Sequence, residues 1–405
     1  MTPPAITPAP GGITAPAGYR AAGVACGLKR PPGLDVALVV SDDVASAAGI
    51  FTTNRAVAAP VVVSREQLAR SGGYARAIAV NSKCANACTG TAGMAAARAM
   101  AAAAAEAVGC DPEHVLIAST GVIGMRLDSG KVAAGIDEAA RRLNRDAHLV
   151  AAQAIMTTDV SPKEAAVHVR TPGGRFTIGG MVKGAGMIEP HLATMLGFLT
   201  TDAAVGPATL DRALREAARD TFNAITVDGE PSTNDTVFLL ANGASAVAID
   251  EATYPALAGG LYALCAGLAR EIVRGGEGAT KLATVRIAGA ASDDEARRAA
   301  RLIANSPLVK TALNGGDPNW GRLVAVAGRA GVAFDPDRTV VRIGGVTLYD
   351  GATVFAERER EAADHLRGPE VEVTVDLGAG GAGAATMWTC DFSAEYVRIN
   401  ADYRT

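Results

Sequence analysis

The spacing of apolar and polar residues predicts short strands separated by longer helical segments. Between Val36 and Ser82, β-branched residues gather in short runs that turn residues bound, which is typical of strands. The predicted strands are VALVV, AGIFTT, APVVVS, AIAVNS, VLIAS, EAAVHVR, RFTIGGMVKG, ATML and KLATVRIAGA. Two later stretches, TVVRIGGVTLYDG and VEVTVDLGAGGAGAATMWTCDF, each have the pattern of a hairpin.

Helical periodicity marks the longer segments, where apolar residues recur on one face. The Ala-rich segment that starts at Thr91 has the length of a membrane span. It contains Arg98 and Glu106, and alanine is only weakly apolar, so we expect a soluble helix. The predicted helices are Thr91–Val108, roughly Asp128–Leu143, Ala208–Ala224, Tyr254–Val273 and the amphipathic run DDEARRAARLIA.

These elements alternate in blocks rather than one by one. Such blocks favour an α+β (α/β layered) fold, with helices covering layered sheets, over a regular βαβ winding. A chain of 405 residues is long enough for two or three domains, and a composition shift near Lys281 indicates a smaller C-terminal one. The N-terminal stretch MTPPAITPAPGGITAPAGYR lacks the features of a secretory signal, and its prolines predict an extended, mobile arm.

Composition and charge narrow the class of protein. Hydrophobic residues make up 49% and charged residues 20%, as expected of a chain that folds. The net charge of −4 predicts no basic face for nucleic acid or an anionic membrane. The six cysteines are scattered, and Cys84 and Cys88 do not form a CxxC pair, so we expect neither a disulfide framework nor a zinc site. Reduced thiols predict a cytoplasmic protein.

Several families of enzyme are excluded by missing motifs. No glycine cluster matches GxxxxGK[ST], and none gives GxGxxG between a strand and a helix, so we do not expect a nucleotide fold. The GxSxG elbow of serine hydrolases is also absent. The five histidines show no HExxH or paired spacing, so no metal site is predicted.

The remaining candidates are polar clusters in apolar surroundings. Each also has a structural explanation, such as a turn, a cap or a glycine that ends a helix. Gly276-Glu277-Gly278 isolates one carboxylate between glycines, which suits close approach of a ligand. The other clusters are Ser119-Thr120-Gly121, Thr157-Thr158-Asp159, Ser232-Thr233-Asn234-Asp235-Thr236 and the turn Asn314–Trp320. Alone, these features indicate only a soluble, enzyme-like globule.

Together these segments resemble one family, the ornithine acetyltransferases, also called glutamate N-acetyltransferases or the ArgJ family. The resemblance covers nearly the whole chain, and its most specific part is KGAGMIEPHLATML, from Lys183 to Leu196. At Lys83 and Cys84 the sequence departs from the family pattern. The other matching segments are ITAPAGYRAAGVACGLK, NSKCANACTG, ASTGVIG, AIMTTD, DGEPSTNDT, GEGATK, SPLVKTALNGGDPNWGR and VRINADYRT.

The resemblance implies a DmpA/ArgJ-like sandwich of β-sheets covered by helices, made as a self-cleaving precursor. The cut would fall between Ala193 and Thr194, giving an α chain of residues 1–193 and a β chain of residues 194–405. Within the β chain, residues from about 285 to 405 would form the smaller C-terminal α+β domain. The family also implies an α₂β₂ heterotetramer.

In this family Thr194 would be the nucleophile. In the precursor its hydroxyl would attack the preceding carbonyl, and an N→O acyl shift would give an ester that water hydrolyses. The freed α-amino group, with a reference pKa of about 7.7–8.0, would then act as a base beside the hydroxyl. One residue would supply both nucleophile and base, so no histidine is needed.

The other site residues follow from the family match. Thr120 and Gly121 match the oxyanion-hole positions. Lys183 and the chain terminus would hold charged ends of the substrate, and Glu277 the ornithine ammonium. An alternative for Lys183 is a purely electrostatic role that lowers the pKa of the Thr194 amine. The matching substrate-contact positions are Thr157, Lys183, Thr194, Glu277, Asn400 and Thr405.

The reaction implied is ping-pong acetyl transfer from N2-acetyl-L-ornithine to L-glutamate, in the cyclic route of arginine biosynthesis. No metal or organic cofactor is expected, and acetyl-CoA is a candidate co-substrate because some members use it to acetylate glutamate. The expected partners are small molecules and the protein's own cleaved chains. Two alternatives are an aminopeptidase or amidase that uses the same N-terminal threonine, and a catalytically silent amino-acid-binding protein.

Overall fold

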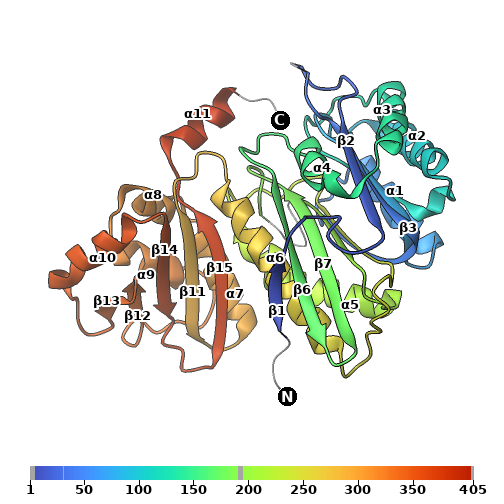
Figure 1. The fold of residues 1–405 in the computed structure, drawn as a ribbon. Helices are drawn as coiled ribbons and strands as arrows, with labels where there is room; N and C mark the ends of the chain where they lie inside the picture. The colour runs from blue at the N-terminus through green and yellow to red at the C-terminus, as the bar shows by residue number, and fades with distance from the viewer. Residues whose placement is uncertain (1–4, 31, 190–194, 403–405) are drawn as a thin grey trace.

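The computed structural model describes residues 5–30, 32–189 and 195–402, which form two β-sheets with helices packed against them (Figure 1). The larger sheet has nine strands and the smaller has six. The expected layering of sheets and helices is confirmed. The strands of the larger sheet, in spatial order, are β1 (Ile6–Ala9), β6 (Lys163–Thr171), β7 (Gly174–Lys183), β8 (Leu196–Thr201), β10 (Thr236–Ala241), β3 (Val36–Phe51), β4 (Tyr74–Asn81) and β5 (Val115–Ser119), while β2 (Tyr19–Val24) pairs with β3.

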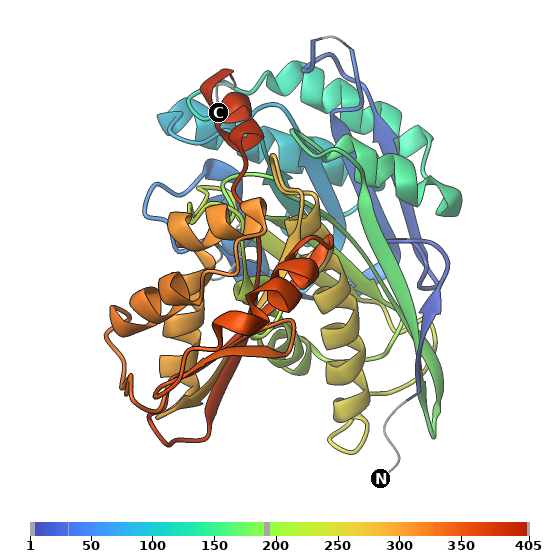
Figure 2. The same cartoon turned by 90° about the vertical axis from the view of Figure 1, so that its left-hand side faces the viewer.

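The larger sheet bends so that its two halves face each other across an inner core. Phe198 on β8 and Phe238 on β10 share this core with Ile78 on β4 and Leu116 on β5. Strands β8 and β10 are buried along their whole length, because this core lies on one face and helices cover the other. The result is a sandwich, with helices on its outer faces (Figure 2).

Two groups of helices cover the outer faces of the sandwich. Helices α5 (Pro207–Arg219) and α6 (Tyr254–Arg274) pack on the side of β6, β7, β8 and β10. The opposite side, formed by β3, β4 and β5, packs against α2 (Gly90–Val108) and α3 (Ser129–Arg141). Helix α1 (Ala59–Arg70) lies beside β5, and α4 (His148–Ala154) lies beside β2.

Helix α6 is the one stretch in the described ranges with the length and composition to cross a membrane. Its most apolar window is 56% buried inside the protein. Leu257, Leu261, Leu264 and Leu268 all belong to the core of the first unit. Here α6 serves as a core helix.

The smaller sheet forms a second unit, from which the last helix reaches back toward the first (Figure 1). Helices α7 (Asp293–Ala304), α8 (Pro307–Gly315), α9 (Trp320–Gly328) and α10 (Glu359–Leu366) share their apolar core with this sheet. The last helix is α11 (Ala394–Asp402). The sheet order is β13 (Val346–Asp350), β12 (Val340–Ile343), β14 (Glu370–Asp376), β11 (Leu282–Ala290), β15 (Gly383–Cys390) and β9 (Ile225–Thr226).

The predicted strand APVVVS and the predicted mobile N-terminal arm are wrong, whereas VALVV and AGIFTT are confirmed as strand. The run APVVVS begins helix α1, because Pro60 suits the first helical turn and the buried residues Pro60, Val63 and Gln67 recur at helical spacing on one face. The N-terminal arm contains β1, whose Ile6 pairs with Val169 of β6. The runs VALVV and AGIFTT belong to one long strand, β3, with an irregularity after Val40.

The second predicted hairpin is also wrong. Strands β14 and β15 do not pair, because β11 lies between them, parallel to β14 and antiparallel to β15. The glycine-rich segment between β14 and β15 therefore crosses over β11. The first predicted hairpin is confirmed as β12 and β13.

The helix predictions agree more closely with the structure. DDEARRAARLIA forms α7 over its full length, and the hydroxyl of Ser292 caps it by accepting from the Glu295 N–H. Asp128 caps α3 in the same way. Helix α5 ends at Arg219 rather than at Ala224, and a short 3₁₀ turn follows.

Candidate active site

A cavity of about 160 Å³ lies where the C-terminal end of β7, the N-terminal ends of β8 and β10, and the turn after β5 meet. Four of the polar clusters seen in the sequence contribute to its wall, and the turn Asn314–Trp320 does not. The lining residues are Ala85, Thr120, Gly121, Ile123, Thr157, Thr158, Lys183, Gly186, Met187, Ile188, Met195, Leu196, Asp228, Glu230, Ser232, Thr233, Asn234, Asp235, Glu277, Tyr396 and Asn400.

Thr120 and Gly121 form one wall of the cavity. The Thr120 N–H donates to the Asn81 carbonyl (3.0 Å), so its hydroxyl is the donor that remains for the cavity. The Gly121 N–H has no partner among the described residues. Gly121 has φ +130°, and a Cβ there would lie 2.1 Å from the carbonyl carbon of Lys83, so only glycine fits. One hydroxyl and one N–H therefore form a donor pair suited to an oxyanion.

The turn that carries these donors is held by residues far away in the sequence. The Asn234 side-chain amide donates to the carbonyls of Ala85 (2.6 Å) and Ser119 (2.8 Å). The Lys83 carbonyl accepts from the Val122 N–H (3.0 Å). Lys83, singled out in the sequence analysis, thus supports the turn through its backbone. The polar cluster before β10 is therefore part of the site's framework.

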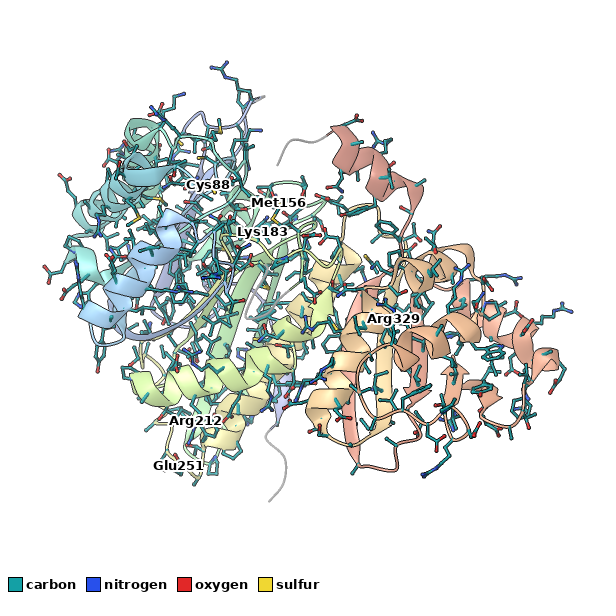
Figure 3. All side chains as sticks on the ribbon, turned by 180° about the vertical axis from the view of Figure 1, so that it is seen from behind. Cys88, Met156, Lys183, Arg212, Glu251 and Arg329 are labelled. Carbon is teal, nitrogen blue, oxygen red and sulfur yellow. The ribbon has the colours of Figure 1, made fainter. Side chains whose placement is uncertain are left out.

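Lys183 brings a positive charge to the donor pair. It ends β7 in the interior of the molecule, with its side chain buried (Figure 3). Its Nζ lies 3.2 Å from Thr120 Oγ1 and donates to it. Burial lowers the pKa of Lys183, and the negative charge of Asp159 acts in the opposite direction. Thr157 lines the cavity nearby, and its N–H donates to the Asp159 carboxylate (3.2 Å).

Glu277 lines another part of the cavity, just after α6. Its N–H donates to the Ala185 carbonyl (2.8 Å). Its carboxylate rests against Gly186, where a Cβ would lie 2.3 Å from Glu277 Oε2. Asn400 on α11 donates to the same carboxylate oxygen at 2.9 Å. Gly186 thus allows the Glu277 carboxylate to approach its backbone closely, and α11 completes this part of the wall.

The chain is firmly held immediately before residues 190–194. The Asp228 carboxylate accepts from the N–H groups of Met187 (2.7 Å) and Ile188 (2.8 Å). Glu189 is 4% exposed, forms an ion pair with Arg301 of α7, and accepts from Asn305 (2.9 Å). The second unit of the protein thereby fixes this part of the first.

The chain is equally fixed immediately after these residues. The Met195 carbonyl accepts from the Thr236 N–H (2.9 Å), and β8 begins at Leu196. Met195 and Leu196 are buried. Ala193 and Thr194, the predicted cleavage and nucleophile positions, lie outside the described residues, as does Thr405.

The charges around the cavity favour a ligand with cationic groups. Four carboxylates and one lysine belong to its described lining: Asp228, Glu230, Asp235, Glu277 and Lys183. Lys183 lies by the donor pair. In residues 5–30, 32–189 and 195–402, no group of three or more His, Cys, Asp or Glu side chains has the geometry of a metal site.

Two site residues were missed by the sequence reasoning. Asp228 belongs to the quoted segment DGEPSTNDT but was not singled out, because its role depends on backbone groups from Met187 and Ile188. Tyr396 lines the cavity from α11 and donates its hydroxyl to Asp228 (3.2 Å). Burial and the charge of Asp228 raise the pKa of Tyr396, so it stays a neutral donor.

The sequence and the structure of this chain are similar to those of known proteins. The ArgJ family model matches residues 20–405. The arginine biosynthesis bifunctional protein ArgJ of Symbiobacterium thermophilum is 49% identical over 400 residues, which cover 98% of this chain and 99% of that protein. The solved ArgJ chain of Bacillus halodurans is 39% identical with a TM-score of 0.50, and covers 52% of this chain and 100% of its own. The ornithine acetyltransferase of Mycobacterium tuberculosis, solved in complex with ornithine, is 43% identical with a TM-score of 0.44, and covers 47% of this chain and 100% of its own.

Proposed function

The chain belongs to the ArgJ family, and we propose on that premise that its cavity transfers an acetyl group from N2-acetyl-L-ornithine to L-glutamate. The protein is an ornithine acetyltransferase, an acyltransferase of arginine biosynthesis. The observation that carries the mechanism is the convergence of the Thr120 hydroxyl, the Gly121 N–H and Lys183 at the point where β8 begins. Thr194 is two residues before Leu196, the first residue of that strand.

The proposed nucleophile is Thr194, freed by cleavage of the Ala193–Thr194 bond. Anchors on both sides of residues 190–194 support this cleavage, because a bond held between fixed ends can be presented to one hydroxyl. The length of the solved Bacillus halodurans chain also supports cleavage at this position. It aligns over its whole length yet covers 52% of this chain, and residues 194–405 make up the same share.

Cleavage proceeds through an ester. The Thr194 hydroxyl attacks the Ala193 carbonyl carbon, the C–N bond breaks, and the Thr194 nitrogen leaves as an amine. Water then hydrolyses the ester, so the Ala193 carboxylate ends the α chain and Thr194 begins the β chain with a free amine and hydroxyl. The amine is then placed to take the hydroxyl proton during transfer.

Acetyl transfer takes two steps. The Thr194 hydroxyl attacks the acetyl carbonyl of acetylornithine and gives its proton to the Thr194 amine. The Thr120 hydroxyl and Gly121 N–H stabilise the resulting oxyanion, as two preorganised donors do in acyl transfer. As the tetrahedral intermediate collapses, the ornithine nitrogen takes the proton and leaves. The neutral glutamate amine then attacks the acetyl-Thr194 ester and passes a proton to the Thr194 amine, and the Thr194 oxygen takes that proton as it leaves, which releases N-acetylglutamate and restores the hydroxyl.

The substrate groups are assigned by charge. Glu277, oriented by Asn400, binds the side-chain ammonium of acetylornithine. Lys183 and Thr157 contact the substrate from another part of the cavity wall. Thr405 is assigned to the substrate from its family position alone. We also assign the second activity of this bifunctional family to acetylation of glutamate from acetyl-CoA through the same ester. We further propose that the cleaved chains assemble as an α₂β₂ heterotetramer in the cytoplasm.

Ornithine release from acetylornithine, measured with and without glutamate, tests this function. The proposed route predicts that glutamate strongly accelerates continuous ornithine release and that acetylglutamate forms in equal amount. No ornithine release at any substrate concentration would overturn it. Release of free acetate at the same rate with and without glutamate would instead identify an amidase.

A further inference from the structure

The carboxylate of Asp159 connects several parts of the cavity wall from behind. Its Oδ1 accepts from the Lys163 ammonium (2.7 Å) and from the Gly184 N–H (2.7 Å). Its Oδ2 accepts from the Thr157 N–H (3.2 Å). Thr157 lines the cavity, and Gly184 directly follows Lys183, which also lines it. One side chain therefore fixes the backbone at one lining residue, Thr157, and directly beside another, Lys183.

The Asp159–Lys163 pair is withdrawn from water, with side chains 1% and 2% exposed. Burying two charges has a large desolvation cost, and apolar pairs of similar size often stabilise a fold at least as well. Lys163 begins β6 opposite Val182 of β7, so it sits beside the strand end that carries Lys183. The position of this charged pair suggests a task beyond stability.

That task concerns the charge of Lys183. Burial lowers the pKa of Lys183, and Asp159 is the strongest influence that raises it. Lys163 lowers it further, while Asp235 and Glu277 raise it, and the cation of Lys29 also faces this region. Burial alone would raise the pKa of Asp159, but the charges of Lys183 and Lys163 hold this pKa at about 2. The carboxylate is therefore ionised at neutral pH.

We propose that Asp159 is a positioning residue for acetyl transfer: it holds Lys183 charged beside Thr120 and fixes the Thr157 backbone, while Lys163 acts as its counter-ion. The inference rests on the function proposed for the cavity. Asp159 contacts Lys163 directly and its charge also acts on Lys183, so one carboxylate offsets part of the charge of two buried cations. Without Asp159, the two buried ammonium groups, which repel each other, would lose the carboxylate that attracts both.

The pH profile of ornithine release tests this role because the two partners of the pair act on Lys183 with opposite sign. Activity that needs protonated Lys183 is lost as pH rises through the Lys183 pKa. In Asp159→Asn, the alkaline limb of kcat/KM is expected to move to lower pH. In Lys163→Met, which removes a repelling cation, the limb is expected to move to higher pH. At neutral pH, Asp159→Asn should lower kcat/KM by about 10- to 100-fold, as expected for loss of one charge-assisted contact.

Asp202→Asn is the matched control. Asp202 is also buried and also accepts from two backbone N–H groups, those of Ala17 (3.0 Å) and Thr177 (2.7 Å), but it lies beyond the other end of β8. Its substitution should leave the alkaline limb in place. If Asp159→Asn fails to fold, the double variant Asp159→Asn with Lys163→Met removes both charges together and should fold while still showing reduced kcat.

Each outcome has one meaning. Alkaline limbs that move in opposite directions in the two single variants support the proposal. Limbs that stay in place, or that move in the same direction, overturn it, because a purely structural pair would give one of these results. Wild-type protein that releases no ornithine would instead overturn the proposed function itself. Intact mass should be recorded for each variant first, so that only cleaved protein enters the kinetic comparison.

Discussion

The ammonium nitrogen of Lys183 lies 3.2 Å from the hydroxyl oxygen of Thr120, although the two residues are 63 positions apart. Strand β7, which ends at Lys183, is not a neighbour in the sheet of β5, which ends just before Thr120. The contact exists because the bent sheet brings its two halves together around one inner core. The cavity therefore lies where both layers of the sandwich supply groups. Neither layer alone carries both the donor pair and the cation.

The Thr120 hydroxyl is predicted to act mainly in the transition state. Thr120→Val keeps the shape of the side chain and removes the donor, so kcat should fall by about 100- to 1,000-fold with little change in KM. Steady-state kinetics of ornithine release measure this. Thr200→Val is the matched control, because the Thr200 hydroxyl is also buried but donates to the Ile13 carbonyl outside the cavity. An unchanged kcat in Thr120→Val would contradict the assigned oxyanion role.

Glu277 is predicted to select acetylornithine. Glu277→Gln keeps an oxygen for Asn400 but removes the charge, so KM for acetylornithine should rise by about 10- to 100-fold. The half-reaction of acetyl-enzyme with glutamate should change less, because glutamate has no side-chain ammonium. Rapid mixing of each half-reaction separates the two effects. Equal losses in both would argue against this assignment. Glu372→Gln serves as the control, because the Glu372 side chain is partly exposed and does not line the cavity.

Arg301 is predicted to speed cleavage through its ion pair with Glu189, whose carboxylate is 6% exposed. Arg301→Met removes one anchor of the segment before the cut, so the precursor should persist longer after synthesis. Pulse-labelling followed by gel analysis gives the cleavage half-life. Glu189→Gln should act similarly, and the double variant should be no slower than the worse single variant, because both remove one contact. Cleavage at the wild-type rate in both variants would rule the anchor out.

Asp159 is also predicted to link stability to pH. Its pKa is about 2 in the folded protein, below the ordinary value, so it stabilises the fold above about pH 4 and this contribution is lost as pH falls toward 2. The contribution is about 2 kcal/mol. Denaturant unfolding at several pH values between 2 and 5 should show a steeper decline for wild type than for Asp159→Asn. Unfolding free energies of wild type and Asp159→Asn that decline in parallel as pH falls would contradict the lowered pKa of Asp159.

Local signals explain which elements could be predicted from the sequence. Helix α7 begins at its serine cap and carries three acidic residues in its first turn, so its limits could be read directly. Strand β5 and the following Thr120-Gly121 turn were also recognised from adjacent residues. In α1, however, β-branched residues suggested a strand. Packing of one face against the core, which a single sequence does not display, decided in favour of a helix.

The roles that the sequence could not show depend on distant contacts. Asn234 joins carbonyl groups 149 and 115 positions away, and nothing in its own neighbourhood indicates these partners. Asp228 likewise acts on Met187 and Ile188, across a gap of about 40 positions. The crossing of the β14–β15 connection over β11 has the same origin. The segments that matched the family contained Asn234 and Asp228, but only the folded sandwich shows which backbone groups they bind.

The mass of the purified protein tests the central claim, cleavage before Thr194, most directly. The uncut chain has a mass of 41.0 kDa. We predict two fragments of similar size, one with the N-terminal sequence TMLGFL, and a Thr194→Ala variant that remains a single chain and transfers no acetyl group. A wild-type protein that releases ornithine while its mass stays at that of the full chain would contradict the account.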